Sequence, residues 1–296
     1  MTRIVVGVDG SEGAAAALRW GVREGRLHDW PVTALMTWIL DPRSLGMGGP
    51  ADLTDASYRE TAVKAARELD AAVTGALGKT AASAVEQRVT CDLAASGLLE
   101  AAQPDDLLVV GARGLGGFRS LLLGSVSEQC LRHAPCPIAV VRSHQAPGPK
   151  DGTQRIIVGI DGSETAEEAL RWALDEARAR QASVSVVHAW HIPNVAGYPQ
   201  TTYLFDPGGL EHSAREVLDA AVAGADTSGL PSAVERHLVS AGAAEALLEA
   251  SKGSDLIVVG SRGRGGFSAL LLGSVSHQLA HHATCPLVVI PPAARD

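Results

Sequence analysis

Short apolar runs rich in β-branched residues alternate along this chain with longer stretches rich in Ala, Leu, Glu and Arg. Such runs are typical of strands buried in a parallel sheet, and the longer stretches are typical of helices. The alternation predicts strand–helix units that build a parallel sheet with helices on both faces. In the first half, strands are expected near residues 3–8, 32–38, 85–90, 106–110 and 137–142, and helices near 12–28, 52–77, 94–102 and 125–134. In the second half, strands are expected near 155–160, 184–190, 234–239, 255–259 and 286–290.

The sequence contains one module twice. Residues 155–164 repeat the pattern of residues 3–12, and residues 255–290 repeat residues 106–141 with long identical stretches such as Leu-Leu-Leu-Gly-Ser-Val-Ser. A period of about 150 residues is far longer than a solenoid repeat. Each copy is therefore expected to be a complete α/β domain with its own core.

Length and composition agree with two domains of ordinary size. The chain has 296 residues, of which 46% are apolar and 20% charged. That is enough to bury a sizeable core in each copy. Between the copies lies a polar stretch with Pro and Gly and no periodicity, which is typical of a linker. We expect a first domain at 1–144, a linker at 145–154 and a second domain at 155–296.

Charge and hydropathy argue against two classes of partner. The formal net charge of −8 comes without a cluster of Lys and Arg, which disfavours binding to nucleic acid. No stretch approaches the roughly 18 to 20 apolar residues that a membrane span needs, and the chain enters a predicted strand at Arg3. These features predict a soluble, cytoplasmic protein.

Four cysteines occur without the paired spacing of a disulfide framework, which fits a reducing compartment. They are Cys91, Cys130, Cys136 and Cys285. Cys136 and Cys285 occupy equivalent places, each before a proline. We interpret both as small buried residues at the entry to the last strand rather than as redox switches.

A glycine-spaced loop follows the fourth predicted strand of each copy. It reads Gly111-Ala-Arg-Gly114 with Gly124-Ser125 further on, and it recurs as Gly260-Ser-Arg-Gly263 with Gly273-Ser274. Further glycines of the two loops are Gly116, Gly117, Gly265 and Gly266. Glycines at a strand end allow close approach of a ligand, and the free N–H groups of the following helix favour an anion. The loops are therefore candidate phosphate-binding sites, with Gly124-Ser125 and Gly273-Ser274 as the first choice.

Other interpretations of this loop were compared with phosphate binding. A glycine-rich turn with an ordinary Ser cap accounts for one copy, but the duplication of the glycines and the Ser at fixed spacing favours function. The P-loop is excluded because no lysine precedes Ser125. A dinucleotide fingerprint is excluded because it belongs after the first strand, whereas these glycines follow the fourth.

The first predicted strand of each copy ends in an Asp-Gly-Ser turn. Asp9 and Asp161 lie at the strand tips, where a carboxylate can bind a ribose diol or a magnesium ion, and Gly7 or Gly159 would let a base approach the backbone. The alternative is a turn in which Ser11 or Ser163 caps the next helix, and both roles are compatible. The second strand should add a wall through Thr37 and Ala189.

These motifs together resemble the universal stress protein family, in the tandem-domain form typical of actinobacteria. The resemblance rests on the Val-Gly-Val-Asp-Gly-Ser opening, the glycine loop and the closing Cys-Pro strand, and it covers nearly the whole chain. The glycine pattern is similar to that of the ATP-binding branch. The resemblance implies two Rossmann-like, doubly wound five-stranded parallel sheets of strand order 3-2-1-4-5, stress-linked regulation through an unknown protein partner, and homodimerisation.

The resemblance also implies one ATP site in each domain, with or without Mg²⁺. Asp9, Asp161, Gly7, Gly159, Thr37 and Ala189 would surround the ribose and base. The ribose and phosphates would lie against Gly111, Gly114, Gly124, Ser125 and Val126, and against Gly260, Gly263, Gly273, Ser274 and Val275. Arg113 and Arg262 would pair with phosphate, or would be merely solvated.

Other residues with chemical potential were given structural interpretations. His277 and His281, with Cys285 nearby, have a spacing that suits a metal, but we interpret them as a solvated helix face. His133 and His282 recur near helix ends, where they complement the dipole. Trp20 and Trp172 are expected to pack on the sheet.

The leading hypothesis is a nucleotide-binding regulator rather than an enzyme. No repeated Ser-His-Asp, Cys-His or paired-carboxylate set lies beside the glycine loop. Two alternatives stay open: a slow ATPase or nucleotidyl-transfer enzyme that uses the same sites, and an interaction scaffold with vestigial sites. The loops at 40–51 and 191–209 differ between the copies and are candidate lids or partner surfaces.

Overall fold

A computed structural model describes residues 2–39, 55–115, 122–143, 154–191, 206–264 and 272–293. The chain divides into two compact units, Met1–Ser143 and His144–Asp296. The predicted linker lies outside the described residues except for Gln154, as does most of the two predicted lid loops. No helix in these described ranges has the length and apolar character that crossing a membrane requires.

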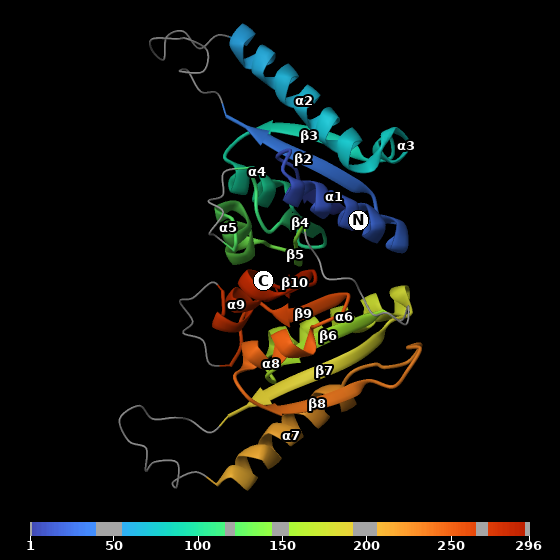
Figure 1. Cartoon of the computed structure of the whole chain (residues 1–296), viewed down its shortest axis with the longest axis vertical. Helices are drawn as coiled ribbons and strands as arrows, with labels where there is room; N and C mark the ends of the chain where they lie inside the picture. The colour runs from blue at the N-terminus through green and yellow to red at the C-terminus, as the bar shows by residue number, and fades with distance from the viewer. Residues whose placement is uncertain are drawn as a thin grey trace, which may run out of the picture. The chain divides into compact units, whose positions relative to one another are not determined.

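Both units have the predicted alternation of strands and helices (Figure 1). The first unit contains β1 Ile4–Gly7, α1 Glu12–His28, β2 Val32–Trp38, α2 Asp55–Leu77, α3 Lys79–Ala82, β3 Glu86–Cys91, α4 Ala94–Ala101, β4 Leu107–Gly111, α5 Ser125–His133 and β5 Ile138–Val141. The second contains β6 Arg155–Ile160, α6 Glu164–Arg180, β7 Ser183–Trp190, α7 Pro207–Ala223, β8 Glu235–Ser240, α8 Ala243–Ala250, β9 Leu256–Gly260, α9 Ser274–His282 and β10 Leu287–Ile290. The short α3 was not predicted, because four residues are too few to show helical periodicity.

The strands of each unit are parallel and follow the predicted order. The first sheet runs β3-β2-β1-β4-β5 and the second β8-β7-β6-β9-β10. In both, the chain starts in the middle strand, proceeds to one edge and then crosses to the other side. The carboxyl ends of β1 and β4, or of β6 and β9, therefore meet where the strand order reverses, which is where open α/β sheets bind ligands.

Helices cover both faces of each sheet. In the first unit α1 and α2 pack on one face, and α4 and α5 on the other. Neighbouring residues of β1 show the two faces, because Val6 lies against Gly21 of α1 whereas Gly7 lies against Leu98 of α4. In the second unit α6 and α7 form one layer and α8 and α9 the other. This is the doubly wound α/β fold that the sequence predicted.

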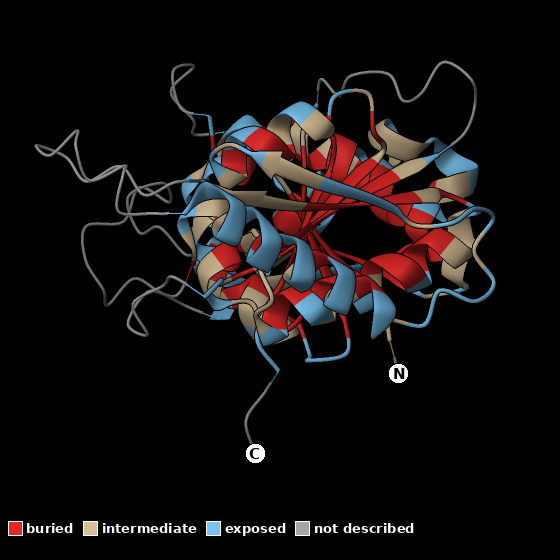
Figure 2. Ribbon diagram, turned by 90° about the horizontal axis from the view of Figure 1, so that it is seen from below, coloured by how far each residue is buried: buried red, intermediate tan, exposed pale blue. Residues whose placement is uncertain are grey.

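The core of each unit consists of the strands and the inward faces of the helices, and Figure 2 shows the buried strands enclosed by helices whose outer faces are exposed. Trp20 is buried, as expected, whereas Trp172 is half-buried. Cys136 and Cys285 are also buried, in agreement with their interpretation as packing residues. Burial raises the pKa of the Cys136 thiol to about 12. At neutral pH the thiol therefore stays protonated and unreactive.

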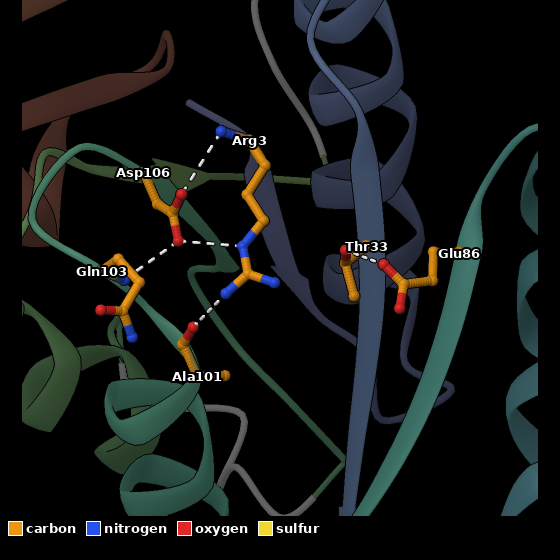
Figure 3. A network of polar contacts seen from close by, with 6 residues as sticks. All are labelled: Arg3, Thr33, Glu86, Ala101, Gln103 and Asp106. Carbon is orange, nitrogen blue, oxygen red and sulfur yellow. Dashed lines mark hydrogen bonds and ion pairs between the residues drawn. The ribbon is translucent and has the colours of Figure 1, made fainter. Parts of the chain in front are cut away.

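A polar network joins the amino ends of β1 and β4, at the opposite end of the sheet from the glycine loop (Figure 3). Arg3 Nε donates to Asp106 Oδ2 at 3.0 Å, and Arg3 Nη2 donates to the Ala101 carbonyl at 2.7 Å. The same Asp106 oxygen accepts the amide of Gln103 at 2.9 Å. Because Asp106 is buried, its charge is compensated by these donors rather than by water. The network fixes the end of the sheet at which β1 and β4 begin.

Candidate functional site

A cleft of about 450 Å³ opens in the second unit where β6, β7 and β9 end. The nine predicted site residues that the structure describes in this unit all line it. They are Gly159, Asp161, Ala189, Gly260, Arg262, Gly263, Gly273, Ser274 and Val275. Gly265 and Gly266 lie outside the described residues. Residues far apart in sequence thus form one wall because the carboxyl ends of parallel strands lie along the same edge of the sheet.

The cleft also contains residues that the motifs did not identify. These are Ile160, Ala166, Val187, His191, Ala243, Leu247, Val259 and Ser276. Ala243 and Leu247 come from α8. This helix lies close to the end of β6 because Gly159 has no side chain. A Cβ on Gly159 would lie 2.8 Å from Leu247 Cδ1. The recurrence of Gly-Leu-Leu and Ala-Leu-Leu at 97–99 and 246–248 was the available signal for this helix.

The first unit has the same backbone frame. Gly7 ends β1, Thr37 lies in β2 and Gly111 ends β4. Arg113 and Gly114 follow β4, and Gly124, Ser125 and Val126 form the start of α5. Gly116 and Gly117 lie outside the described residues.

An aspartate holds the glycine loop in each unit. Asp9 accepts the amide of Ser11 through Oδ1 at 2.9 Å and the amide of Leu115 through Oδ2 at 3.0 Å. Asp161 makes the same pair of bonds, at 3.0 Å from the Ser163 amide and 2.7 Å from the Arg264 amide. Both carboxylate oxygens therefore bind backbone N–H groups and join the first strand of the unit to the loop. We call this arrangement the aspartate clasp.

The clasp explains one glycine in each loop, and packing against the start of α1 or α6 explains another. A Cβ on Gly114 would overlap Asp9 Oδ2. A Cβ on Gly111 would lie 2.5 Å from the carbonyl carbon of Gly13 and 2.9 Å from the Ala14 amide nitrogen. In the second unit, Cβ atoms on Gly263 and Gly260 would meet Asp161 Oδ2 and Thr165 respectively. These glycines are required by packing within the protein, whatever the loop binds.

Gly124 and Gly273 differ from the other glycines, because neither a positive φ nor severe crowding requires glycine there. They are the N-cap residues of α5 and α9, with φ of −83° and −73°. A Cβ on Gly124 would meet nothing nearer than 3.5 Å, and a Cβ on Gly273 would lie 3.1 Å from the Ser261 carbonyl. A glycine that the protein's own packing does not demand fits a place where a ligand approaches the backbone.

The helix starts at α5 and α9 have no side-chain cap among the described residues. The helices begin at Ser125 and Ser274, so these serines are the first helical residues rather than the caps that the sequence suggested. Their side chains are exposed, and the Gly124 amide is already bonded to the Ala112 carbonyl at 2.8 Å. The amides that follow the cap, together with the helix dipole, suit an anion.

Arginines lie around both glycine loops. Arg113 is exposed, and burial together with the nearby charge of Arg113 lowers the pKa of Arg142. Arg142 Nη1 also donates to the Leu122 carbonyl at 3.1 Å. In the second unit Arg262 lines the cleft, while Arg264 Nε donates to the Gly162 carbonyl at 3.0 Å. Positive charge is therefore available beside both helix starts.

The histidine pair on α9 differs from its prediction as a solvated face. His277 and His281 are half-buried, and their ring centroids are 4.5 Å apart. The prediction was wrong because the spacing of polar residues does not show how closely one side of a helix is packed. Within the described ranges, no third His, Cys, Asp or Glu completes a metal-binding group with this pair. His133 and His282 are exposed at the helix ends, as expected.

Comparisons with known proteins agree with the fold and the repeat. The model of the Universal stress protein family matches residues 1–142 and 152–291. A universal stress protein of Mycolicibacterium smegmatis is 35% identical over 290 residues, covering 98% of this chain and 97% of that protein. A universal stress protein of Mycobacterium tuberculosis is 30% identical over 293 residues, with 97% and 95% covered.

The fold also matches a solved structure along nearly its whole length. The crystal structure of a universal stress protein from Archaeoglobus fulgidus is 20% identical, has a TM-score of 0.62 and covers 98% of each chain. At that identity the likeness concerns the fold. The family match on both repeats, together with the mycobacterial relatives, is decisive: the chain belongs to the universal stress protein family, in its tandem two-module form.

Proposed function

We propose that each unit binds one adenine nucleotide, above all ATP, and that the bound nucleotide regulates assembly or partner binding in a stress response. The observation that carries this proposal is the cleft of the second unit. It brings the predicted residues together around a helix start without a side-chain cap. The first unit repeats the clasp and the helix start.

Size and chemistry of the cleft suit a nucleotide. Its volume of about 450 Å³ falls within the roughly 300–1,000 Å³ of typical small-molecule sites. Val187, Ala189 and Leu247 form an apolar wall for a base, whereas the start of α9 and Arg262 supply amides and a positive charge for phosphates. Mg²⁺, when bound, would be held mainly by phosphate oxygens and water.

The clasp favours binding over catalysis. Asp161 is the one carboxylate in the described lining of the cleft, and both its oxygens already accept backbone amides. A carboxylate used in this way is poorly placed to take a proton from water as a general base. We therefore propose a regulator that retains its nucleotide, and we expect no sustained hydrolysis.

Thermal melting with and without Mg-ATP tests nucleotide binding. Ligand at a hundredfold above its dissociation constant stabilises the folded state by about 2.7 kcal/mol, so the melting temperature should rise. Gly124→Val and Gly273→Val place a branched side chain where the phosphates would lie, and the double variant should lose this rise. Gly75→Ala on α2 is a matched control, since nothing lies within 4 Å of its Cβ position. Unchanged melting of the parent protein, with no nucleotide retained on purification, would contradict the proposal.

Light scattering with and without ATP tests the regulatory part. We expect the oligomeric state of the parent protein to depend on ATP and that of the double glycine variant not to. ATP turnover that disappears in Asp9→Ala and Asp161→Ala would instead indicate an enzyme. An oligomeric state that ATP does not change would remove assembly as the regulated step.

A further inference from the structure

The edges of the two sites differ in polarity although their frames are the same. Three large apolar side chains of the first unit are unusually exposed: Ile39 at 59%, Leu93 at 65% and Leu115 at 73%. They follow β2, precede α4 and follow β4, all at the carboxyl end of the sheet. The repeat places His191, Gly242 and Arg264 at the same three positions of the second unit.

Of these three residues of the second unit, His191 is the one that belongs to the described lining of the cleft. Ile39 and His191 each directly follow the tryptophan that ends their strand, Trp38 or Trp190. His191 lines the cleft together with Ala189 and Val187 of β7, the wall that we assign to the base. An imidazole at this position offers a donor and an acceptor of hydrogen bonds, whereas isoleucine offers apolar contact alone.

The charged groups near His191 are few. Asp161 at the end of β6 and Arg262 after β9 line the same cleft, and the lining residues of α8 and α9 carry no charge. Glu245, on α8, lies 3.9 Å through Oε2 from the Cβ position of Gly242 and does not line the cleft. On β7 itself, the ring of His188 is turned to the Ile160 carbonyl, with Nδ1 at 2.8 Å from the oxygen. His191 is therefore the side chain beside the proposed base wall that can both donate and accept a hydrogen bond.

We propose that the two sites are not equivalent, and that His191 is a specificity-determining residue that hydrogen-bonds the base or ribose end of the nucleotide in the second site alone. The inference rests on the proposed nucleotide function. A site that forms a hydrogen bond to its ligand discriminates more strongly than an apolar one, because loss of the bond leaves a polar group without a partner. The second site therefore binds ATP more tightly.

Reciprocal exchange of the two residues tests this inference. Gly124→Val blocks the first site and Gly273→Val blocks the second. Calorimetric titration of each single variant with Mg-ATP therefore measures the remaining site alone. In the second site, His191→Ile should weaken binding about tenfold, and His191→Asn, which keeps a hydrogen-bonding group, should restore most of it. In the first site, Ile39→His should tighten binding. Both side chains are exposed, so folding is expected to be unaffected.

Loss of affinity with His191→Ile and its recovery with His191→Asn form a readout that a merely structural role would not produce, because the two variants differ in whether the side chain can hydrogen-bond the ligand. Equal affinities for parent and exchanged sites would overturn the inference while leaving nucleotide binding intact. Absence of ATP binding in both single-site variants would overturn the proposed function and the inference together.

Discussion

The two units hold the same loop carbonyl with different residues. In the first, a Cβ on Gly13 would overlap the Arg113 carbonyl, so a residue without a side chain permits the contact, and the Ser11 hydroxyl donates to that carbonyl at 3.4 Å. In the second, Thr165 occupies the equivalent position, and its hydroxyl donates to the Arg262 carbonyl at 2.6 Å. In both units, therefore, the loop after the fourth strand takes the same path across the start of α1 or α6. The residue that contacts the loop carbonyl differs between them.

A second exchange shows the same rule beside the site. In the first unit Thr37 Cγ2 would lie 2.8 Å from a Cβ on Gly97, so α4 has no room for a methyl group there. In the second unit the strand residue is Ala189 and the helix residue is Ala246. The pair of threonine and glycine in the first unit and the pair of two alanines in the second fill nearly the same volume. Cores tolerate such volume-conserving exchanges well. The frame of the site is thus maintained by pairs rather than by single residues.

The largest loss of unfolding free energy is expected when the glycine that ends β4 or β9 is replaced. Gly111→Ala would force a methyl group against the backbone of Gly13 and Ala14 and should cost about 2–4 kcal/mol of unfolding free energy. Gly260→Ala should cost less, because its nearest neighbours are atoms of Thr165 at 2.8 and 3.0 Å, which crowd a methyl group less than the backbone of Gly13 at 2.5 Å. Urea unfolding, with hydrogen exchange read on peptides of each unit, measures both. Equal losses of unfolding free energy in the two variants would show that the starts of α1 and α6 pack alike against their loops.

The aspartate clasp should matter equally in both units. An Asn at either position keeps one acceptor but turns an NH₂ group toward the second backbone amide, so Asp9→Asn and Asp161→Asn should each cost about 1–3 kcal/mol. The exposed Asp70, which accepts a hydrogen bond from Gln87 Nε2 at 3.3 Å, provides the control Asp70→Asn, expected to change stability by no more than about 0.5 kcal/mol. Urea midpoints at neutral pH measure all three. A clasp variant as stable as Asp70→Asn would indicate that the loop is held by its other contacts.

Alkaline pH should weaken the first unit more than the second. Burial raises the pKa of Cys130 and Cys136 to about 12, and it raises that of Cys285 also. Because the unfolded thiols ionise near pH 9, stability is fully present below that pH and is lost as the pH rises toward 12. At pH 10.5 the loss of unfolding free energy should be about 1–2 kcal/mol for Cys130 and the same for Cys136.

The second unit supplies the variant that checks this prediction. Leu279 stands where the first unit has Cys130. Cys130→Leu removes one ionisable thiol, so its stability should fall less between pH 8 and 10.5 than that of the parent in urea unfolding. Iodoacetamide at pH 8 should meanwhile label the exposed Cys91 first. A variant that loses as much stability as the parent would assign the alkaline loss to other groups.

The smallest effect is expected where α1 and α6 end. Asp29 and Gln181 both adopt left-handed backbone conformations, with φ of 56° and 54°. Glycine has no Cβ penalty there, so Gln181→Gly should stabilise by up to about 1 kcal/mol. Asp29→Gly should gain less, because aspartate tolerates this region better than glutamine does. Melting temperatures of the two variants provide the comparison, and a loss in Gln181→Gly would mean that its side-chain bond to the Arg178 carbonyl, at 2.8 Å, contributes more.

The sequence predicts the sheet well because each strand carries its own signal. Residues such as Ile4, Val6 and Val109 form uninterrupted apolar runs, and the Asp-Gly-Ser turns mark the helix starts. The positions of the site residues follow from the parallel strand order. Their individual roles do not, because the bond from Asp9 to the Leu115 amide joins residues that meet only after the fold has formed. The cleft position of His191 had no signal either, since its counterpart is an isoleucine.

The polar network at the amino ends of the strands also has a consequence for the duplication. The second unit keeps part of it, because Asp255 Oδ2 accepts the Arg155 amide at 2.9 Å and Arg155 Nη2 donates to the Lys252 carbonyl at 3.0 Å. Each module is thereby anchored at the end of its sheet remote from the glycine loop. Residues at the carboxyl ends of the strands can therefore differ between the two modules, as Ile39 and His191 do, without disturbing the contacts at which the strands begin.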